Sequence, residues 1–135
     1  MVYLGKRLER RTNGTLVRLK MTINNYLNMY NVKCEGWKGN MVRPRVKCRD
    51  GYTVSVQAGY GCYSTPDRFS YYFTHVELGY PNDSDEELLS YAENPNDLTG
   101  TIYAQVPIEL VDSILNKHGG IIGPDFSNTN RKDWE

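Results

Sequence analysis

Two stretches in which apolar and polar residues alternate flank a tight-turn sequence, and this pattern constrains the fold more than any other. The stretches are residues 41–48 and 52–58, and Arg49-Asp50-Gly51 lies between them. An Asp-Gly step in this position is a strong β-hairpin signal, because these residues adopt the backbone angles of tight turns at low cost. The sequence therefore predicts two antiparallel strands, each with one face toward a core.

The first of these two strands carries a regular set of basic residues. Arg43, Arg45, Lys47 and Arg49 recur at every second position, which places them on one face of a strand. Pro44 interrupts the same stretch, and proline is tolerated at a sheet edge because its missing N–H leaves no ladder bond unmade there. We therefore expect an edge strand with one basic face.

Three helices are expected around this hairpin. Thr22 is a good N-cap for a helix that ends near Val32. A capping box at residues 84–87, with Ser84 and Glu87 as its ends, opens a short second helix. Pro107 suits the first turn of a third helix, which Gly119 ends.

Two further strands complete the predicted fold, at residues 70–78 and 101–106. The resulting order is α-β-β-β-α-β-α. This order predicts an α+β fold, in which a small antiparallel sheet of about four strands has two or three helices packed on one side.

The charges divide the chain into two unlike halves. Residues 1–51 hold twelve Lys and Arg against three acids, a net charge of +9, and residues 52–135 have a net charge of −9. Either the basic half faces an anionic partner, or the two halves neutralise each other within one molecule or between copies. We expect a flexible basic N-terminal arm at residues 1–20, a single α+β domain at residues 21–122 and a polar C-terminal tail at residues 123–135.

The cysteines and the N-terminus predict a cytoplasmic protein. Cys34, Cys48 and Cys62 are an odd number, and they lack the close pairs of zinc sites, so neither a disulfide framework nor a metal site is expected. No apolar run approaches the length of a membrane helix, and the first residues are charged where a signal peptide is apolar. No membrane contact is expected.

Catalytic motifs are missing from the sequence. It has no phosphate-binding glycine loop, no zinc-protease helix motif and no nucleophile elbow, so we lean against an enzyme and expect no cofactor. One nucleophilic arrangement remains open, in which Cys62 is paired with His75 and with Asp67 or Glu77. His118, before Gly-Gly, fits a helix-end cation better than a catalyst.

A candidate ligand-binding set is left by this elimination. Its members, called the contact set below, are Arg43, Arg45, Tyr60, Tyr63 and Arg68. Aromatic rings beside arginines suit nucleobases and phosphates, through stacking and charge pairing. They suit protein interfaces equally well. Both ligand classes stay open.

Four stretches of the chain resemble a group of known proteins. They are RPRVKCRDGYTVSVQAG (residues 43–59), YSTP (63–66), YFTHVELGYP (72–81) and VPIELVDSILNKHGG (106–120). Together they resemble small, mostly uncharacterised accessory proteins of bacteriophages and mobile elements of Gram-positive gut bacteria. The resemblance covers about residues 21–122 and implies an accessory protein in the cytoplasm of a bacterial host cell.

Within that setting three functions are weighed. The first is a non-enzymatic phage protein that counters host defence, either as an inhibitor of a nuclease–RNA complex such as CRISPR or by sequestering an anionic nucleotide signal. Its second interface would be the acidic residues 83–87. The alternative is a nucleic-acid-binding accessory protein that uses the basic arm and edge strand. A cysteine-dependent enzyme ranks third. A homodimer is compatible with all three.

Overall fold

The computed structural model describes residues 8–12, 15–30 and 43–125 of the chain. Its elements, in chain order, are β1 (Leu8–Thr12), β2 (Thr15–Leu19), α1 (Ile23–Met29), β3 (Arg45–Cys48), β4 (Thr53–Gln57), β5 (His75–Gly79), the 3-10 helix η2 (Glu86–Tyr91), β6 (Ile102–Pro107), α2 (Ile108–Lys117) and β7 (Ile121–Asp125). Trp37 and Cys34, which the sequence singles out, lie outside the described residues.

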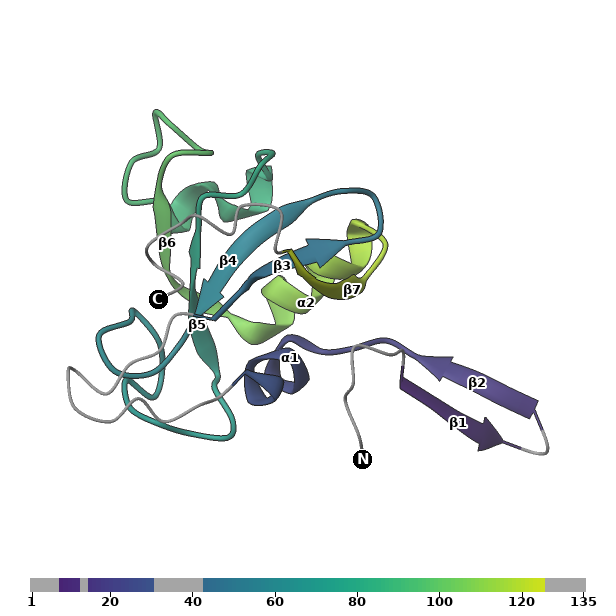
Figure 1. Cartoon of the computed structure of the whole chain (residues 1–135). Coiled ribbons are helices and arrows are strands. Elements are labelled where there is room, and N and C mark those ends of the chain that lie inside the picture. Colours follow the sequence, from purple (N-terminus) through teal and green to yellow (C-terminus); the bar gives the residue numbers. More distant parts are fainter. Residues whose placement is uncertain (1–7, 13–14, 31–42, 126–135) are drawn as a thin grey trace.

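The main sheet is antiparallel throughout, with the strand order β6-β5-β4-β3-β7 (Figure 1). The predicted α+β class is confirmed, and the predicted hairpin is β3–β4, in which Val46 pairs with Val54. The sheet has one strand more than expected, because β7 pairs with β3. Three residues of the predicted C-terminal tail thus belong to a strand.

The prediction that β3 is an edge strand is wrong, since it lies between β4 and β7. Gly119 and Gly120 have φ of +94° and +89°, which lets the chain reverse after α2 and return along β3. A Cβ on Gly119 would lie only 2.8 Å from the Cβ of Arg49. Pro44 precedes β3, so its missing N–H does not disturb the strand.

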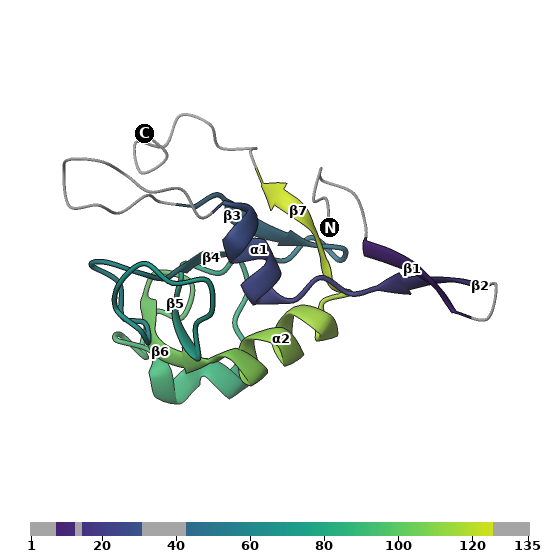
Figure 2. The same ribbon diagram turned by 90° about the horizontal axis from the view of Figure 1, so that it is seen from below.

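A separate hairpin occupies much of the predicted basic arm. β1 and β2 pair with each other in a two-stranded sheet, with Leu8 opposite Leu19 and Thr12 opposite Thr15. Figures 1 and 2 show this hairpin extending away from the main sheet. The flexibility of the arm stays a prediction.

One hydrophobic core joins the sheet to the helices. Val46, Val56 and Val76 are fully buried, and each comes from a different strand. The helices add apolar side chains to the same core: Ile23, Tyr26 and Leu27 from α1, Leu88 from η2, and Ile108, Val111, Ile114 and Leu115 from α2. Figures 1 and 2 both show α1 and α2 side by side. Among the described residues, no helix has the length and apolarity needed to cross a membrane.

The starts of α1 and α2 lie where the sequence predicted them. Thr22 is the N-cap of α1, as predicted, because its Oγ1 accepts a hydrogen bond from the Asn25 N–H at 3.2 Å. Asp112 of α2 accepts a second bond from the Ile23 N–H at 2.8 Å, so α2 also holds the start of α1. α2 follows Pro107 directly, as expected.

The predicted capping box is wrong. η2 begins at Glu86, after Asp85, and no side-chain hydrogen bond caps it. The Asp85 carboxylate instead lies 2.7 Å from Nζ of Lys117, and Glu87 lies 2.9 Å from the same atom. An ion pair with the end of α2 therefore engages Glu87, the acid that the local pattern assigned to capping.

The third predicted strand is also shorter than expected, since β5 begins at His75. Just before it, Asn24 of α1 binds both backbone groups of Phe73: its Nδ2 donates to the carbonyl at 3.0 Å, and its Oδ1 accepts from the N–H at 2.9 Å. The Ile108 N–H donates to the Thr74 carbonyl at 3.0 Å. These bonds use the backbone groups that a longer strand would need.

Substitutions of two neighbouring leucines of η2 test the packing of this core. Leu88 is fully buried, whereas Leu89 is 48% exposed. We expect Leu88→Ala to lower the free energy of unfolding by about 2–5 kcal/mol, because it leaves a cavity in a packed core. Leu89→Ala should change it by less than about 0.5 kcal/mol. Urea unfolding of both variants measures the difference, and equal losses would contradict the assigned packing.

Candidate functional site

The contact set does not form one surface. Tyr60, Tyr63 and Arg68 lie on the segment that joins β4 to β5, residues 59–74, and all three are exposed. We call this segment the tyrosine loop. Arg43 and Arg45 lie outside it. Arg43 binds Ala58 just after the end of β4, and Arg45 binds Thr53 at its start.

Arg43 is buried, with 4% of its surface exposed. Its Nε donates to the Leu27 carbonyl at 3.1 Å and one terminal nitrogen donates to the Ala58 carbonyl at 2.8 Å. Burial lowers the pKa of this guanidinium. Arg43 thus links the end of α1 to the end of β4, and the basic face expected from the alternation is broken at this position.

Arg45 is half-buried and also binds within the protein. One of its terminal nitrogens donates to the Tyr80 carbonyl at 2.7 Å and to Oγ1 of Thr53 at 3.1 Å. Tyr80 has a left-handed backbone, with φ of +50°, which a residue with a side chain adopts only when its surroundings hold it there. Arg45 therefore helps to fix a turn.

The tyrosine loop presents more aromatic surface than the sequence indicated. Its exposed tyrosines are Tyr60 (49%), Tyr63 (51%), Tyr71 (73%) and Tyr72 (59%). The prediction named the first two and placed Tyr71 and Tyr72 in a strand at residues 70–78, which is wrong because β5 starts at His75. Exposed tyrosines gathered on one loop are typical of binding surfaces.

Hydrogen bonds with Ser64 and Glu77 hold the backbone of this loop. Ser64 is buried, and its Oγ accepts from the Gly59 N–H at 3.0 Å and donates to the Pro66 carbonyl at 2.9 Å. The Glu77 carboxylate accepts from the Tyr63 N–H at 2.9 Å. Burial raises the pKa of Glu77, and the bond from Tyr63 opposes that rise.

Gln105 of β6 makes three further hydrogen bonds to this loop. Its N–H donates to the Tyr63 carbonyl at 3.1 Å and its Nε2 donates to the Ser64 carbonyl at 3.2 Å, while its Oε1 accepts from the Thr65 hydroxyl at 2.7 Å. This residue also has a left-handed backbone, with φ of +52°. These three hydrogen bonds tie residues 63–65 of the loop to β6.

The nucleophilic arrangement gains no geometric support. The Cys62 thiol donates to the Tyr60 carbonyl at 3.8 Å, and Nδ1 of His75 lies 2.9 Å from the Thr74 hydroxyl. Asp67 is exposed, and Glu77 binds the loop backbone. Cys62, His75 and Glu77 thus each have a local contact of their own, and the cysteine enzyme stays an untested alternative.

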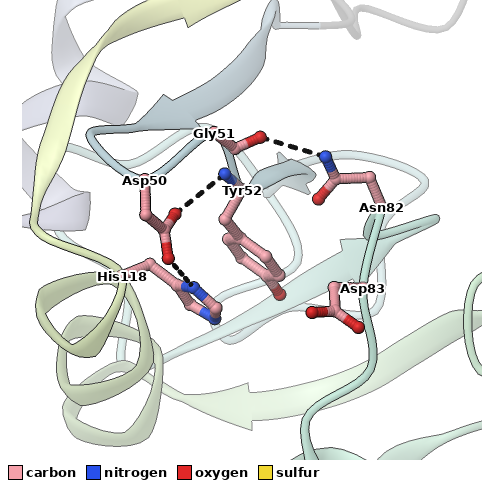
Figure 3. A pocket seen from close by; sticks show the side chains of 6 residues that line it. All are labelled: Asp50, Gly51, Tyr52, Asn82, Asp83 and His118. Carbon is pink, nitrogen blue, oxygen red and sulfur yellow. Dashed lines mark hydrogen bonds and ion pairs between the residues drawn. The ribbon is translucent and has the colours of Figure 1, made fainter.

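A second site, which the sequence did not reveal, is a hollow of about 230 Å³ beside the β3–β4 turn (Figure 3). Its lining residues are Asp50, Gly51, Tyr52, Asn82, Asp83 and His118. Nδ1 of His118 lies 2.7 Å from Oδ2 of Asp50, and its Nε2 lies 3.4 Å from both carboxylate oxygens of Asp85. The His118 ring stacks on Tyr52, with 3.8 Å between ring centroids.

These groups form a charged network at the end of α2. Hydrogen bonds from His118 and from the Tyr52 N–H hold the pKa of Asp50 below its usual value. Contacts with Asp85 and Glu87 raise the pKa of Lys117. His118 is the C-cap of α2, as the prediction of a helix-end residue requires. The network joins the β3–β4 turn, α2 and the start of η2.

No protein-family model, curated protein or solved structure matches this chain. The resemblance to accessory proteins of phages and mobile elements therefore stays a prediction. Within the described ranges, no three His, Cys, Asp or Glu side chains gather in a geometry that could hold a metal ion.

Stability measurements can distinguish the buried Arg43 of the contact set from the exposed Arg68. We expect Arg43→Ala to lower the free energy of unfolding by about 1–3 kcal/mol, because the carbonyls of Leu27 and Ala58 lose a buried donor. Arg68→Ala removes an exposed side chain and should change stability by less than about 0.5 kcal/mol. If urea unfolding gives Arg43→Ala the stability of the wild type, the structural role of Arg43 is refuted.

The Asp50–His118 contact predicts a pH dependence of stability. The folded-state pKa of Asp50 lies below its unfolded value. The contact therefore stabilises the fold above the unfolded pKa of about 3.9, and this stabilisation is lost as the pH falls through the lower folded pKa. We expect wild type to exceed Asp50→Asn in stability near pH 6, and the gap to shrink below about pH 4.

Chemical denaturation at several pH values measures this gap. Glu93→Gln, which alters an exposed carboxylate on the segment before β6, is the matched control. Its stability should follow that of the wild type throughout. A gap for Asp50→Asn that stays constant down to the lowest pH would show that the ionised carboxylate contributes nothing.

Proposed function

We propose that this protein acts by binding another protein through the tyrosine loop, without catalysis. The observation that carries the proposal is the combination of four exposed tyrosines with a loop backbone held by hydrogen bonds with Ser64, Glu77 and Gln105. The exposed fractions of Tyr60, Tyr63, Tyr71 and Tyr72 range from 49% to 73%. Tyrosine offers a large contact area and a polar end at a low cost in conformational entropy.

The fixed loop shape favours binding energetically. Ordering a flexible loop on association costs about 0.5–1.5 kcal/mol for each side chain that becomes fixed, with a further cost for the backbone. Here Gln105, Ser64 and Glu77 already hold the backbone. Asn28 of α1 adds a bond to the Tyr71 carbonyl at 2.8 Å. Much of the backbone cost therefore arises during folding and not during binding.

The charges of the loop favour a protein partner over a nucleic acid. Residues 59–74 contain a single base, Arg68, with the acid Asp67 beside it. Arg43 and Arg45, the other cations of the contact set, bind backbone carbonyls of their own chain. Binding to a nucleic acid or a nucleotide draws much of its strength from several cations on phosphates.

The biological setting of this binding rests on the resemblance alone. In that setting we propose a host-defence protein, or the protein part of a nuclease–RNA complex, as the partner. Sequestering a nucleotide is less favoured, because the cations that would hold its phosphates are engaged in the fold. A nucleic-acid partner would have to use the basic hairpin β1–β2 instead.

Capture from a lysate of Gram-positive gut bacteria tests the proposal. We expect the wild type to retain a protein partner after nuclease treatment. Tyr63→Ala and Tyr71→Ala should each weaken that complex by about thirtyfold, the loss typical of truncating an aromatic side chain at the centre of an interface. Affinities for the purified partner, measured by calorimetry, give the ratio.

Leu89→Ala is the matched control, because Leu89 is as exposed as Tyr63 and lies outside the loop. It should leave the affinity unchanged. A partner held equally well by both tyrosine variants would contradict the role of the loop. If nuclease treatment removes all binding, the nucleic-acid alternative replaces the proposal.

A further inference from the structure

Two carboxylates, those of Asp50 and Asp83, line the hollow of Figure 3, and further acids lie on the chain just after Asp83. Asp50, Asp83, Glu86 and Glu87, which we call the acidic rim, are exposed, and the carboxylate of Asp85 is buried next to them. The cations of this region are few: Lys117 is paired with Asp85 and Glu87, His118 lies against Asp50 and Asp85, and Arg49 is exposed beside the turn. Carboxylates outnumber basic side chains here even when Lys117, His118 and Arg49 are all counted.

The polar groups that line the hollow have already used most of their hydrogen-bond donors. Nδ2 of Asn82 donates to the Gly51 carbonyl at 3.0 Å, and the Tyr52 N–H donates to Asp50 at 2.9 Å. Both ring nitrogens of His118 face carboxylates. The capacity that remains is mainly that of oxygen acceptors, which suits a cation rich in N–H donors and excludes phosphates and carboxylates as ligands.

Tyr52 supplies an independent observation. Its side chain lines the hollow, between His118 and Asp83 in Figure 3, and only 4% of the residue is exposed. Its hydroxyl is buried and faces the Asp85 carboxylate, outside good hydrogen-bond geometry. Burial raises the pKa of this hydroxyl, and the nearby Asp85 carboxylate raises it further. A poorly satisfied buried hydroxyl beside a carboxylate adds to the excess of oxygen acceptors in this region.

The chain itself carries a suitable cationic element. The strands β1 and β2 include Arg10, Arg11 and Arg18, and residues 1–20 as a whole hold six bases and one acid. These strands pair only with each other among the described strands, and the hairpin extends away from the main sheet (Figures 1 and 2). An isolated two-stranded hairpin is at best marginally stable in water, so a docking surface would stabilise it.

We propose that the hollow and the acidic rim receive the arginine-bearing hairpin β1–β2 of a second copy of this chain. The opposite charges of the two chain halves, +9 and −9, make two copies complementary when the basic part of one meets the acidic part of the other. The contact joins two different surfaces, so it is a head-to-tail contact that extends into rings or chains. It is separate from the tyrosine loop.

Sedimentation velocity of the full chain tests this proposal. At about 50 mM salt we expect the weight-average mass to rise with protein concentration above the 15.5 kDa of the monomer. At about 500 mM salt, where charges are strongly screened, the mass should return to that of the monomer. If the wild-type protein stays monomeric at low salt, the proposal is overturned. This holds even if the hairpin is then found to dock on the acidic rim of the same molecule.

Charge reversal identifies the two surfaces. Arg10→Glu/Arg11→Glu changes the hairpin, and Asp83→Lys/Glu86→Lys changes the rim without altering the Asp50–His118 or Lys117 contacts. We expect each double variant alone to lose at least tenfold in association constant. An equimolar mixture of the two should associate again, because each supplies the charge that the other lost. Arg18→Glu gives a second hairpin variant should the first fail to fold.

Two controls complete the design. Glu93→Lys/Glu109→Lys reverses exposed carboxylates elsewhere and should associate as the wild type does. Tyr63→Ala should also associate normally, which separates this proposal from the function of the tyrosine loop. The proposal is overturned if either double variant associates as the wild type does, or if their mixture stays monomeric.

Discussion

The chain reversal at the end of α2 determines the layout of this molecule. The N–H groups of Arg49 and Asp50 donate to the carbonyls of Gly120 and His118, both at 3.1 Å, so the β3–β4 turn is bonded directly to the end of the helix. After this junction the chain continues as β7, which pairs with β3. This pairing makes β3 an inner strand. It also brings His118 to Asp50 and so builds one wall of the hollow. Two glycines with positive φ make the reversal possible.

Arginine illustrates how folding can use residues that a sequence pattern assigns to binding. Arg43 and Arg45 alternate along a strand, as an exposed basic face would. Their guanidiniums carry several donors on a long side chain, which can bind backbone carbonyls at or near the ends of helices and strands. The carbonyls of Leu27, Ala58 and Tyr80 are such groups. What remains for a partner at the tyrosine loop is mainly aromatic surface.

The parts of the fold that local periodicity determines could be predicted from the sequence. The α+β class, the β3–β4 hairpin, the N-cap at Thr22 and the helix after Pro107 all rest on contacts within a few residues. The errors occur where distant groups compete. Glu87 pairs with Lys117 and does not form a capping box with Ser84, and Asn24 binds Phe73 where a strand was expected. Asp50 and His118 are 68 residues apart, so no local pattern could pair them. Of the candidate site, the sequence identified Tyr60, Tyr63 and Arg68 but not Tyr71 or the hollow.

The two proposed surfaces differ in the physics that governs them. The tyrosine loop carries one acid and one base, so its binding energy comes from burying aromatic area and depends little on ionic strength. The acidic rim and the basic hairpin are separated in sequence and carry opposite charges, so their attraction is weakened by salt. The chain has zero net charge, yet the described ion pairs inside the fold involve only part of its acids. The other acids and the basic hairpin, which extends away from the main sheet, can therefore form a second contact that is independent of the tyrosine loop. Salt acts mainly on the second contact, and truncation of tyrosines acts on the first.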